Sequence, residues 1–287
     1  MRPRLHDGRA DRAPEGPDGA EALERLRWLE RRARPGSAVT AVTAAGLVEP
    51  GAIDVRAEWP DAPERLARTD RVCHLALLAA YRALGAPAGR ERPVAVVYGS
   101  ALASLTTNVR FYEKIMRRGA RLADPKRFPY TSPNAAAGEV AIAFGLTGPN
   151  LALTSGFHAG LDAVLTARRL VASGRAPAAL AVVADAASEE SARWLSGAGL
   201  VAQGPAEGAA ALLLEPDGAR GALCSISEAP FEPAVPATGP CVSLAPAAAM
   251  ELVRAIRSGL KEPRTFAARC PLGGGEARVI VSPARRS

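Results

Sequence analysis

Apolar strands that alternate with helices constrain the fold of this chain more than any other feature of its sequence. Residues 93–100 (PVAVVYGS) are almost uninterruptedly apolar, which is typical of a strand covered on both faces. Similar runs predict strands at 38–48, 151–155, 176–187 and 208–216. Apolar residues at helical spacing predict helices at 70–85, 107–119, 139–146 and 157–174. This alternation predicts an α/β layered fold around a mostly central sheet.

The first 36 residues differ from the rest of the chain. Residues 1–19 mix Arg, Asp, Gly and Pro without periodicity, which predicts a disordered tail. Residues 20–34 have the spacing of a short amphipathic helix that ends at Pro35-Gly36. We therefore expect the organised part of the chain to begin near residue 37.

Basic residues outnumber acidic ones, with 36 Lys and Arg against 29 Asp and Glu and a formal net charge of +7. A nucleic-acid-binding surface needs its basic residues on one face or element. Here they are scattered, and the group at 25–34 is interleaved with glutamates, as on a solvated helix. We expect no nucleic-acid partner, and the excess of positive charge suits an acidic partner protein at most.

Four cysteines, Cys73, Cys224, Cys241 and Cys270, show no spacing typical of a metal site. No apolar run is long enough to span a membrane, and the start of the chain does not have the pattern of a signal peptide. We expect a cytoplasmic protein with reduced thiols and without a metal, a cofactor or a membrane span.

Several short motifs follow one another in a recognisable order. Pro133-Asn134 precedes a predicted helix, Gly148-Pro149 precedes a predicted strand, residues 154–160 turn from that strand into a helix, and Glu207-Gly208-Ala209 opens the last strand. This order resembles the N-terminal half of the β-ketoacyl synthases of the thiolase fold. The resemblance covers about residues 38–222 and implies a complete N-terminal half at 37–222.

The resemblance places Phe157 at the position of the family's nucleophilic Cys. That chemistry needs a thiolate at a helix N-terminus, and phenylalanine can neither ionise nor form a thioester. None of the four cysteines lies in the turn. The resemblance therefore implies no catalytic residue here, with Ser155 and His158 as polar neighbours of a degenerate nucleophile position.

The family's second catalytic feature is a pair of His, or a His and an Asn, from the C-terminal half. This chain has only His6, His74 and His158. Residues 243–259 and 270–282 resemble a late helix and the closing glycine-rich turn and strand, but the piece between them is missing. We expect residues 223–287 to be a strongly abbreviated C-terminal half that packs on the same core.

A ketosynthase-like subunit without a nucleophile resembles the chain-length factors of polyketide and polyene pathways. The run Ala159-Gly160-Leu161-Asp162-Ala163 is similar to the start of their helix, although Phe157 departs from the Gln that is frequent there. The short form is similar to the subunit of aryl polyene pathways. This implies a pseudoenzyme that forms a heterodimer with an active ketosynthase, receives chains from an acyl carrier protein, and serves polyketide, polyene or fatty-acid-like biosynthesis.

In the thiolase fold the strand before the nucleophile pairs with its counterpart in the partner, which here is about 151–155. The resemblance also implies an acyl tunnel beside this interface. The tunnel and interface residues that it implies are Leu105, Thr106, Asn108, Phe111, Tyr112, Leu151, Leu153, Gly160, Leu161 and Asp162.

Two other functions stay open. The first is a stand-alone acyltransferase or thioesterase that uses His158 with Ser155 or a Cys. The second is a non-catalytic protein that binds an acyl carrier protein. Residues 156–160 also have the glycine spacing of a hydrolase elbow, but His158 stands where that motif needs Ser.

Overall fold

An eight-stranded sheet runs through the computed structural model, which describes residues 39–202, 204, 207–229, 241–270 and 275–284. Its strand order is β3-β2-β4-β6-β1-β7-β10-β9. The strands are β1 Val39–Val48, β2 Val94–Gly99, β3 Asn150–Leu153, β4 Ala178–Asp185, β6 Gly208–Pro216, β7 Cys224–Glu228, β9 Arg264–Arg269 and β10 Glu276–Pro283. Strands β3, β2 and β4 are parallel, and the other neighbours in the sheet are antiparallel.

Seven α-helices surround this sheet within the described residues. They are α2 Val55–Glu58, α3 Arg71–Leu84, α4 Leu105–Arg118, α5 Ala135–Phe144, α6 Ala159–Ala172, α7 Glu189–Gly197 and α8 Pro246–Arg257. Short 3-10 turns lie at Glu64–Arg68, Ala120–Leu122 and Phe128–Thr131, and β5 Val201–Ala202 pairs with β8 Cys241–Val242. The strands and helices predicted between 38 and 216 are thus confirmed within a few residues, whereas the predicted tail and helix at 1–36 lie outside the described residues.

Both faces of the central strands are buried, as the apolar run at 93–100 predicts. Val96 and Tyr98 of β2 pack with α3 and α5 on one face. Ala95 and Val97 pack with α6 and α8 on the other face. Because successive side chains of a strand point to opposite faces, a strand between two helical layers must be apolar throughout.

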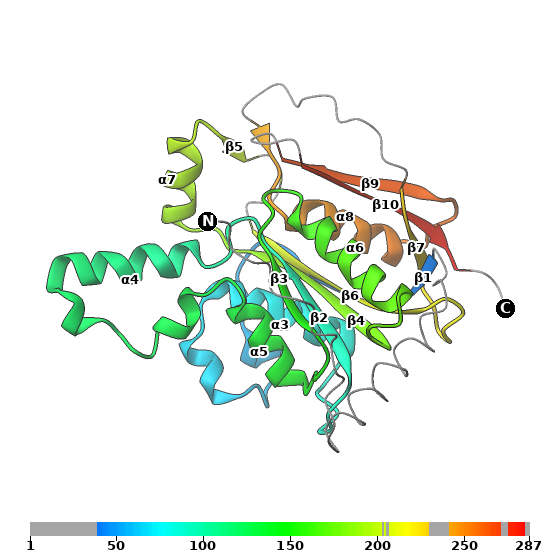
Figure 1. Cartoon of the computed structure of the whole chain (residues 1–287), viewed down its shortest axis with the longest axis horizontal. Coiled ribbons are helices and arrows are strands. Elements are labelled where there is room, and N and C mark those ends of the chain that lie inside the picture. The colour runs from blue at the N-terminus through cyan, green and yellow to red at the C-terminus, as the bar shows by residue number, and fades with distance from the viewer. Residues whose placement is uncertain (1–38, 203, 205–206, 230–240, 271–274, 285–287) are drawn as a thin grey trace, which may run out of the picture.

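The C-terminal strands fold back over the second helical layer. Figure 1 shows β9 and β10 crossing over α6 and α8, so that these helices lie between two parts of one sheet. Phe266, Val279 and Val281 point into the same core as α6 and α8. Ile280, between the two valines of β10, and the flanking Arg278 and Ser282 are only half-buried. The described residues of β7, α8, β9 and β10 thus pack in the same core as α6.

Small residues allow the helices to approach the sheet closely. A methyl group at Gly46 on β1 would lie 2.0 Å from the carbonyl oxygen of Ala79 on α3. A methyl group at Gly160 on α6 would lie 2.0 Å from the carbonyl oxygen of Ala245, which precedes α8. Both contacts are with backbone atoms, which cannot move without shifting a whole helix.

We predict that Gly46→Ala lowers the free energy of unfolding by about 1–3 kcal/mol, because the added methyl overpacks the contact between β1 and α3. Gly138→Ala on α5 is the matched control, since nothing lies within 4 Å of the added methyl. That control should be neutral or stabilising, because Ala has the higher helix propensity. Denaturant unfolding measures both variants, and equal stability of the two would contradict the packing argument.

Candidate functional site

The candidate site lies where the three parallel strands end. In open α/β sheets, ligands bind beyond the carboxyl ends of parallel strands. Here β2 is followed by residues 100–104, β3 by residues 154–158 and β4 by residues 186–188. These three connections meet at one edge of the sheet, which also holds the turn predicted to correspond to the family's nucleophile position.

The turn from β3 into α6 carries a buried hydrocarbon side chain. Gly156 has φ of 101°, a backbone conformation that L side chains rarely adopt, and it brings Phe157 and His158 to the start of α6. Phe157 is only 3% exposed. It packs in an apolar cluster with Leu102, Leu195, Leu200 and Leu244. The buried members of this cluster are therefore side chains that cannot ionise.

His158 and Asp162 form a polar pair one helical turn apart. The Nε2 atom of His158 lies 3.3 Å from Oδ2 of Asp162. Ser155 donates a hydrogen bond of 2.6 Å to the same carboxylate oxygen. The hydroxyl of Ser155 is therefore engaged by Asp162, and no hydrogen bond joins Ser155 to His158 in the described part of the chain.

Asp185, at the end of β4, holds the site together and was not among the residues predicted from the sequence. Its fully buried carboxylate accepts hydrogen bonds from the Ser100 hydroxyl and from the backbone N–H groups of Ala101, Leu102 and Ala245. Burial raises the pKa of Asp185, and these four donors oppose that shift. The signal for this residue was visible in the sequence, where one Asp ends an otherwise apolar strand at 176–187.

Glu207 is a second anchor, and it explains part of the motif Glu207-Gly208-Ala209. Its carboxylate pairs with Arg71 at the start of α3 and accepts hydrogen bonds from the backbone N–H groups of Gly51 and Ala187. Hydrogen bonding to Arg71 lowers the pKa of Glu207. The residue therefore joins three connections beside the start of β6.

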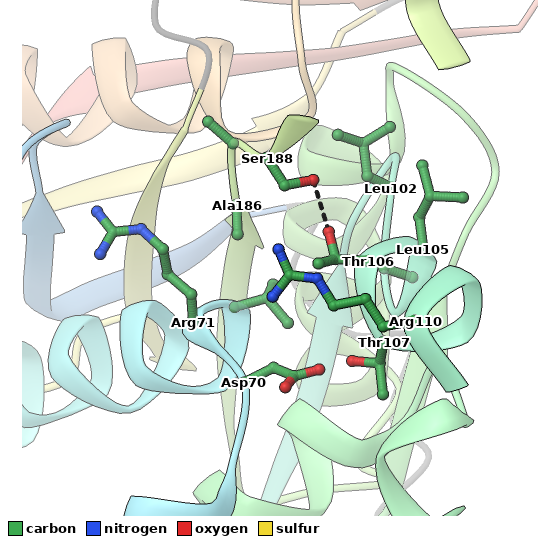
Figure 2. A pocket seen from close by; sticks show the side chains of 12 residues that line it. Asp70, Arg71, Leu102, Leu105, Thr106, Thr107, Arg110, Ala186 and Ser188 are labelled. Atoms are coloured by element: carbon green, nitrogen blue, oxygen red, sulfur yellow. Dashed lines mark hydrogen bonds between the residues drawn. The ribbon is translucent and has the colours of Figure 1, made fainter. Parts of the chain in front are cut away.

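A small cavity of about 120 Å³ opens beside this edge (Figure 2). It lies between the N-terminal turns of α3 and α4 and the connections after β2 and β4. Thr106 and Ser188 are joined across it by a hydrogen bond of 2.8 Å. Its lining residues are Asp70, Arg71, Val72, Leu102, Ala103, Leu105, Thr106, Thr107, Arg110, Ala186, Ala187 and Ser188.

Both arginines that line this cavity form ion pairs. Arg71 pairs with Glu207, and Arg110 pairs with Glu190 at 2.8 Å. The hydrogen bond from Arg110 lowers the pKa of Glu190 to about 2. Asp70 is different, because its Oδ2 atom is buried without a hydrogen-bond partner and burial raises its pKa. The cavity thus combines apolar walls with hydroxyl groups and one unsatisfied carboxylate.

The predicted tunnel and interface residues divide into three groups. Leu105 and Thr106 line the cavity. Asn108, Phe111 and Tyr112 lie further along α4 and do not line it: Asn108 donates to the Ser104 hydroxyl, and Phe111 is buried in ring contacts with Tyr112 and Phe128. Leu151 and Leu153 lie on β3 at the sheet edge, while Gly160, Leu161 and Asp162 lie on the first turn of α6.

Two further properties of the described residues bear on the site. Among them, no group of three or more His, Cys, Asp and Glu side chains is arranged to hold a metal ion. None of the helices formed by these residues has the length and apolar character needed to cross a membrane.

We predict that Phe157→Ala lowers the free energy of unfolding by about 3 kcal/mol, because it leaves a cavity in the apolar cluster. Phe157→Leu keeps most of the buried volume and should cost less than half as much. Denaturant unfolding of the two variants measures the difference. A Phe157→Ala variant as stable as the parent chain would show that the side chain does not fill this site.

A family model described as the β-ketoacyl synthase N-terminal domain matches residues 14–218. The chain is 36% identical over 134 residues to a protein described as a polyketide β-ketoacyl synthase of Streptomyces cyaneus, and 33% identical over 95 residues to a 3-oxoacyl-[acyl-carrier-protein] synthase 2 of Vibrio cholerae. These alignments cover 43% and 33% of this chain, but only 32% and 23% of the relatives. The chain thus matches about a third or less of the length of these curated relatives.

Solved structures with the same fold cover far more of the chain. The ishigamide ketosynthase/chain length factor aligns with a TM-score of 0.67 and 18% identity over 86% of this chain and 99% of that chain. A β-ketoacyl synthase from Burkholderia phymatum aligns with a TM-score of 0.66 and 15% identity over 92% of this chain and 96% of that chain. The complex of a ketosynthase with its chain length factor from Xenorhabdus doucetiae aligns with a TM-score of 0.57 and 15% identity over 85% of this chain and 99% of that chain.

At these identities the structural likenesses show the fold, which is the thiolase-like layered α/β fold predicted from the motifs. The family match covers strands β1, β2, β3, β4 and β6 of the sheet and the turn at Phe157. The chain therefore belongs to the β-ketoacyl synthase family.

Proposed function

We propose that this chain is a chain-length-factor-like subunit that performs no condensation and pairs with an active ketosynthase. The observation that carries the proposal is Phe157, a buried hydrocarbon at the position that the family resemblance assigns to the nucleophile. Condensation needs an ionisable nucleophile at this turn, and the partner would have to supply it.

The histidines of the described residues support the same proposal. His74 lies on α3, on the other face of the sheet from α6, and its Nε2 atom is 2.7 Å from the carbonyl oxygen of Leu66. His158 faces Asp162. No two histidines of the described residues therefore meet at the turn, where decarboxylation of an extender unit would need them.

An open sheet edge supports a partner subunit. Strand β3 is the last strand on its side of the sheet, and the carbonyl oxygens of Pro149 and Leu153 accept hydrogen bonds from the side of β2. Because a strand alternates its hydrogen-bonding groups, Asn150 and Ala152 direct theirs to the open edge. Such an edge favours pairing with a strand of another chain.

Helix α4 adds exposed apolar side chains on the same side of the molecule. Figure 1 shows α4 projecting from the body on the side where β3 ends the sheet. The large apolar side chains exposed on α4 and the turns after it are Tyr112, Met116, Leu122 and Phe128, of which Met116 is 83% exposed. Exposed apolar groups that are concentrated in this way favour burial against a protein partner.

The cavity beside α4 suggests the class of chain that this subunit would accommodate. Leu102, Leu105 and Val72 provide apolar walls, whereas Thr106, Thr107 and Ser188 provide hydroxyl groups. A saturated alkyl chain would leave these hydroxyl groups and the free Oδ2 of Asp70 without new partners. We therefore favour an oxygen-bearing polyketide chain, delivered by an acyl carrier protein in the cytoplasm, over a fatty-acid-like one. The aryl polyene pathway would supply a largely hydrocarbon chain and is the second choice.

We predict that Ala152→Pro abolishes co-purification with a co-expressed ketosynthase. Proline removes the N–H that faces the open edge, and an edge strand tolerates it because that N–H has no partner within the sheet. Ala152→Val keeps the N–H and should still bind. An equal unfolding midpoint for the two variants controls for misfolding, and a Pro variant that co-purifies at the parent ratio would contradict pairing through β3.

We predict that Leu105→Ala lengthens the products of the reconstituted pair by at least one extension unit, because it enlarges the cavity beside α4. Glu113→Ala lies on the same helix, is exposed and does not line the cavity, so it should leave the product unchanged. Mass spectrometry of the products measures chain length. Unchanged length in Leu105→Ala would remove this cavity from the acyl path. Phe111 is a poorer probe, because its ring packs against Phe128 of the same chain and does not line the cavity.

The alternative function, a module that binds an acyl carrier protein, makes a different prediction in the co-purification experiment. The net charge of +7 suits an acidic carrier protein, as it suits other acidic partners. Recovery of this chain with an acyl carrier protein but without any ketosynthase would favour that alternative.

A further inference from the structure

Cys270 lies beside the turn that has lost the nucleophile. It follows β9, is half-buried, and packs against the apolar cluster of Phe157. Its backbone N–H donates a hydrogen bond of 2.8 Å to the carbonyl oxygen of Gly275. A methyl group at Gly156 would lie 3.1 Å from the Cys270 sulfur, so the thiol touches the backbone of the turn.

His158 lies near the same point. A methyl group at Gly156 would lie 4.0 Å from Nδ1 of His158. His158 is only 9% exposed, and its Nδ1 is buried with no hydrogen-bond partner. The backbone of Gly275 also lies against the imidazole, because a methyl group there would be 2.2 Å from Cε1. The Cys270 thiol and an unpartnered imidazole nitrogen thus flank Gly156.

Asp162 positions this imidazole. Its Oδ2 atom faces Nε2 of His158 at 3.3 Å and is held by the Ser155 hydroxyl. A carboxylate beside Nε2 favours the tautomer with the proton on Nε2, which leaves the lone pair on Nδ1. Nδ1 is therefore the nitrogen that can accept a proton, and it is the ring atom nearest to the position of a methyl group on Gly156.

The other described thiols differ from Cys270. Burial raises the pKa of Cys73 and of Cys224 to about 12, so both stay protonated near neutral pH. Cys270 is less buried and lies beside the first turn of the 14-residue helix α6. The first N–H groups of a helix have no partner within it, and they favour negative charge at this end.

We propose that Cys270 is an acyl-accepting thiol with His158 as its general base and Asp162 as the residue that positions the imidazole. The ligand is an acyl thioester, and its carrier-bound source rests on the proposed function. The Cys270 sulfur attacks the thioester carbonyl while Nδ1 of His158 takes the thiol proton. The bond from the acyl carbon to the carrier sulfur then breaks, and His158 returns the proton to the leaving thiol. The products are S-acyl Cys270 and a free carrier thiol.

This transfer is compatible with a subunit that does not condense. It forms one thioester and breaks another, and it needs neither decarboxylation nor the paired histidines. Oxygen that becomes negatively charged in the attack can accept hydrogen bonds from the first N–H groups of α6. The chain would hold an acyl group at the turn without extending it.

The test uses the full chain and hexanoyl-N-acetylcysteamine as the probe. We expect intact-mass spectrometry to show one added hexanoyl group, and peptide mapping to place it on Cys270 and not on Cys73 or Cys224. Cys270→Ser should not form a thioester. His158→Gln should slow acylation by about 100-fold. His74→Gln, on the far face of the sheet, should acylate at the parent rate.

A pH profile separates catalysis from a structural role of His158. The dependence of the acylation rate on pH should differ between the parent chain and His158→Gln, because only the parent chain has a side chain at this position that can take the thiol proton. Acylation of another residue, no acylation, or equal rates and profiles in folded His158→Gln would overturn the proposal. Co-purification with a ketosynthase is measured separately, so failure of acylation with intact pairing would remove only this inference.

Discussion

The hydrogen bonds to Asp185 are the interaction on which the rest of the site depends. One buried carboxylate ties the connection after β2, through Ser100, Ala101 and Leu102, to the backbone of Ala245 just before α8. A carboxylate without these donors would be costly to bury, and the donors would be costly to bury without it. The N-terminal half and the C-terminal remnant are thus joined at the same edge of the sheet that holds Phe157.

Close packing of α6 against α8 places the turn relative to that edge. Gly160 allows α6 to touch the backbone of Ala245, and Asp185 holds the same residue from the strand side. Leu244, one residue earlier, is thereby brought into the cluster around Phe157. The buried phenylalanine is therefore part of the packing that joins the turn before α6 to the segment before α8.

Periodicity and motif order predicted most of the fold and the position of Phe157, because both depend on neighbours in the sequence. The strand at 93–100 was predictable since burial on both faces requires an uninterrupted apolar run. Strand β9 (RTFAAR) was not predicted, because only Phe266 of its six residues is buried. The roles of Asp185 and Cys270 also escaped prediction, since they depend on contacts between segments 60 to more than 100 residues apart. Of the predicted tunnel residues, Leu105 and Thr106 line the cavity, because only the first turns of α4 face the connection after β4.

Alternate residues of β10 lie on a buried face and on a half-buried face. Val279 and Val281 are buried against α6 and α8, whereas Ile280 between them and the flanking Arg278 and Ser282 are half-buried. An antiparallel sheet can have one face packed on the core and the other face without a further layer over it. At the opposite edge of the sheet, β3 is open and α4 exposes apolar side chains. The proposed pairing with a partner subunit would cover this edge, which also carries the turn at Phe157.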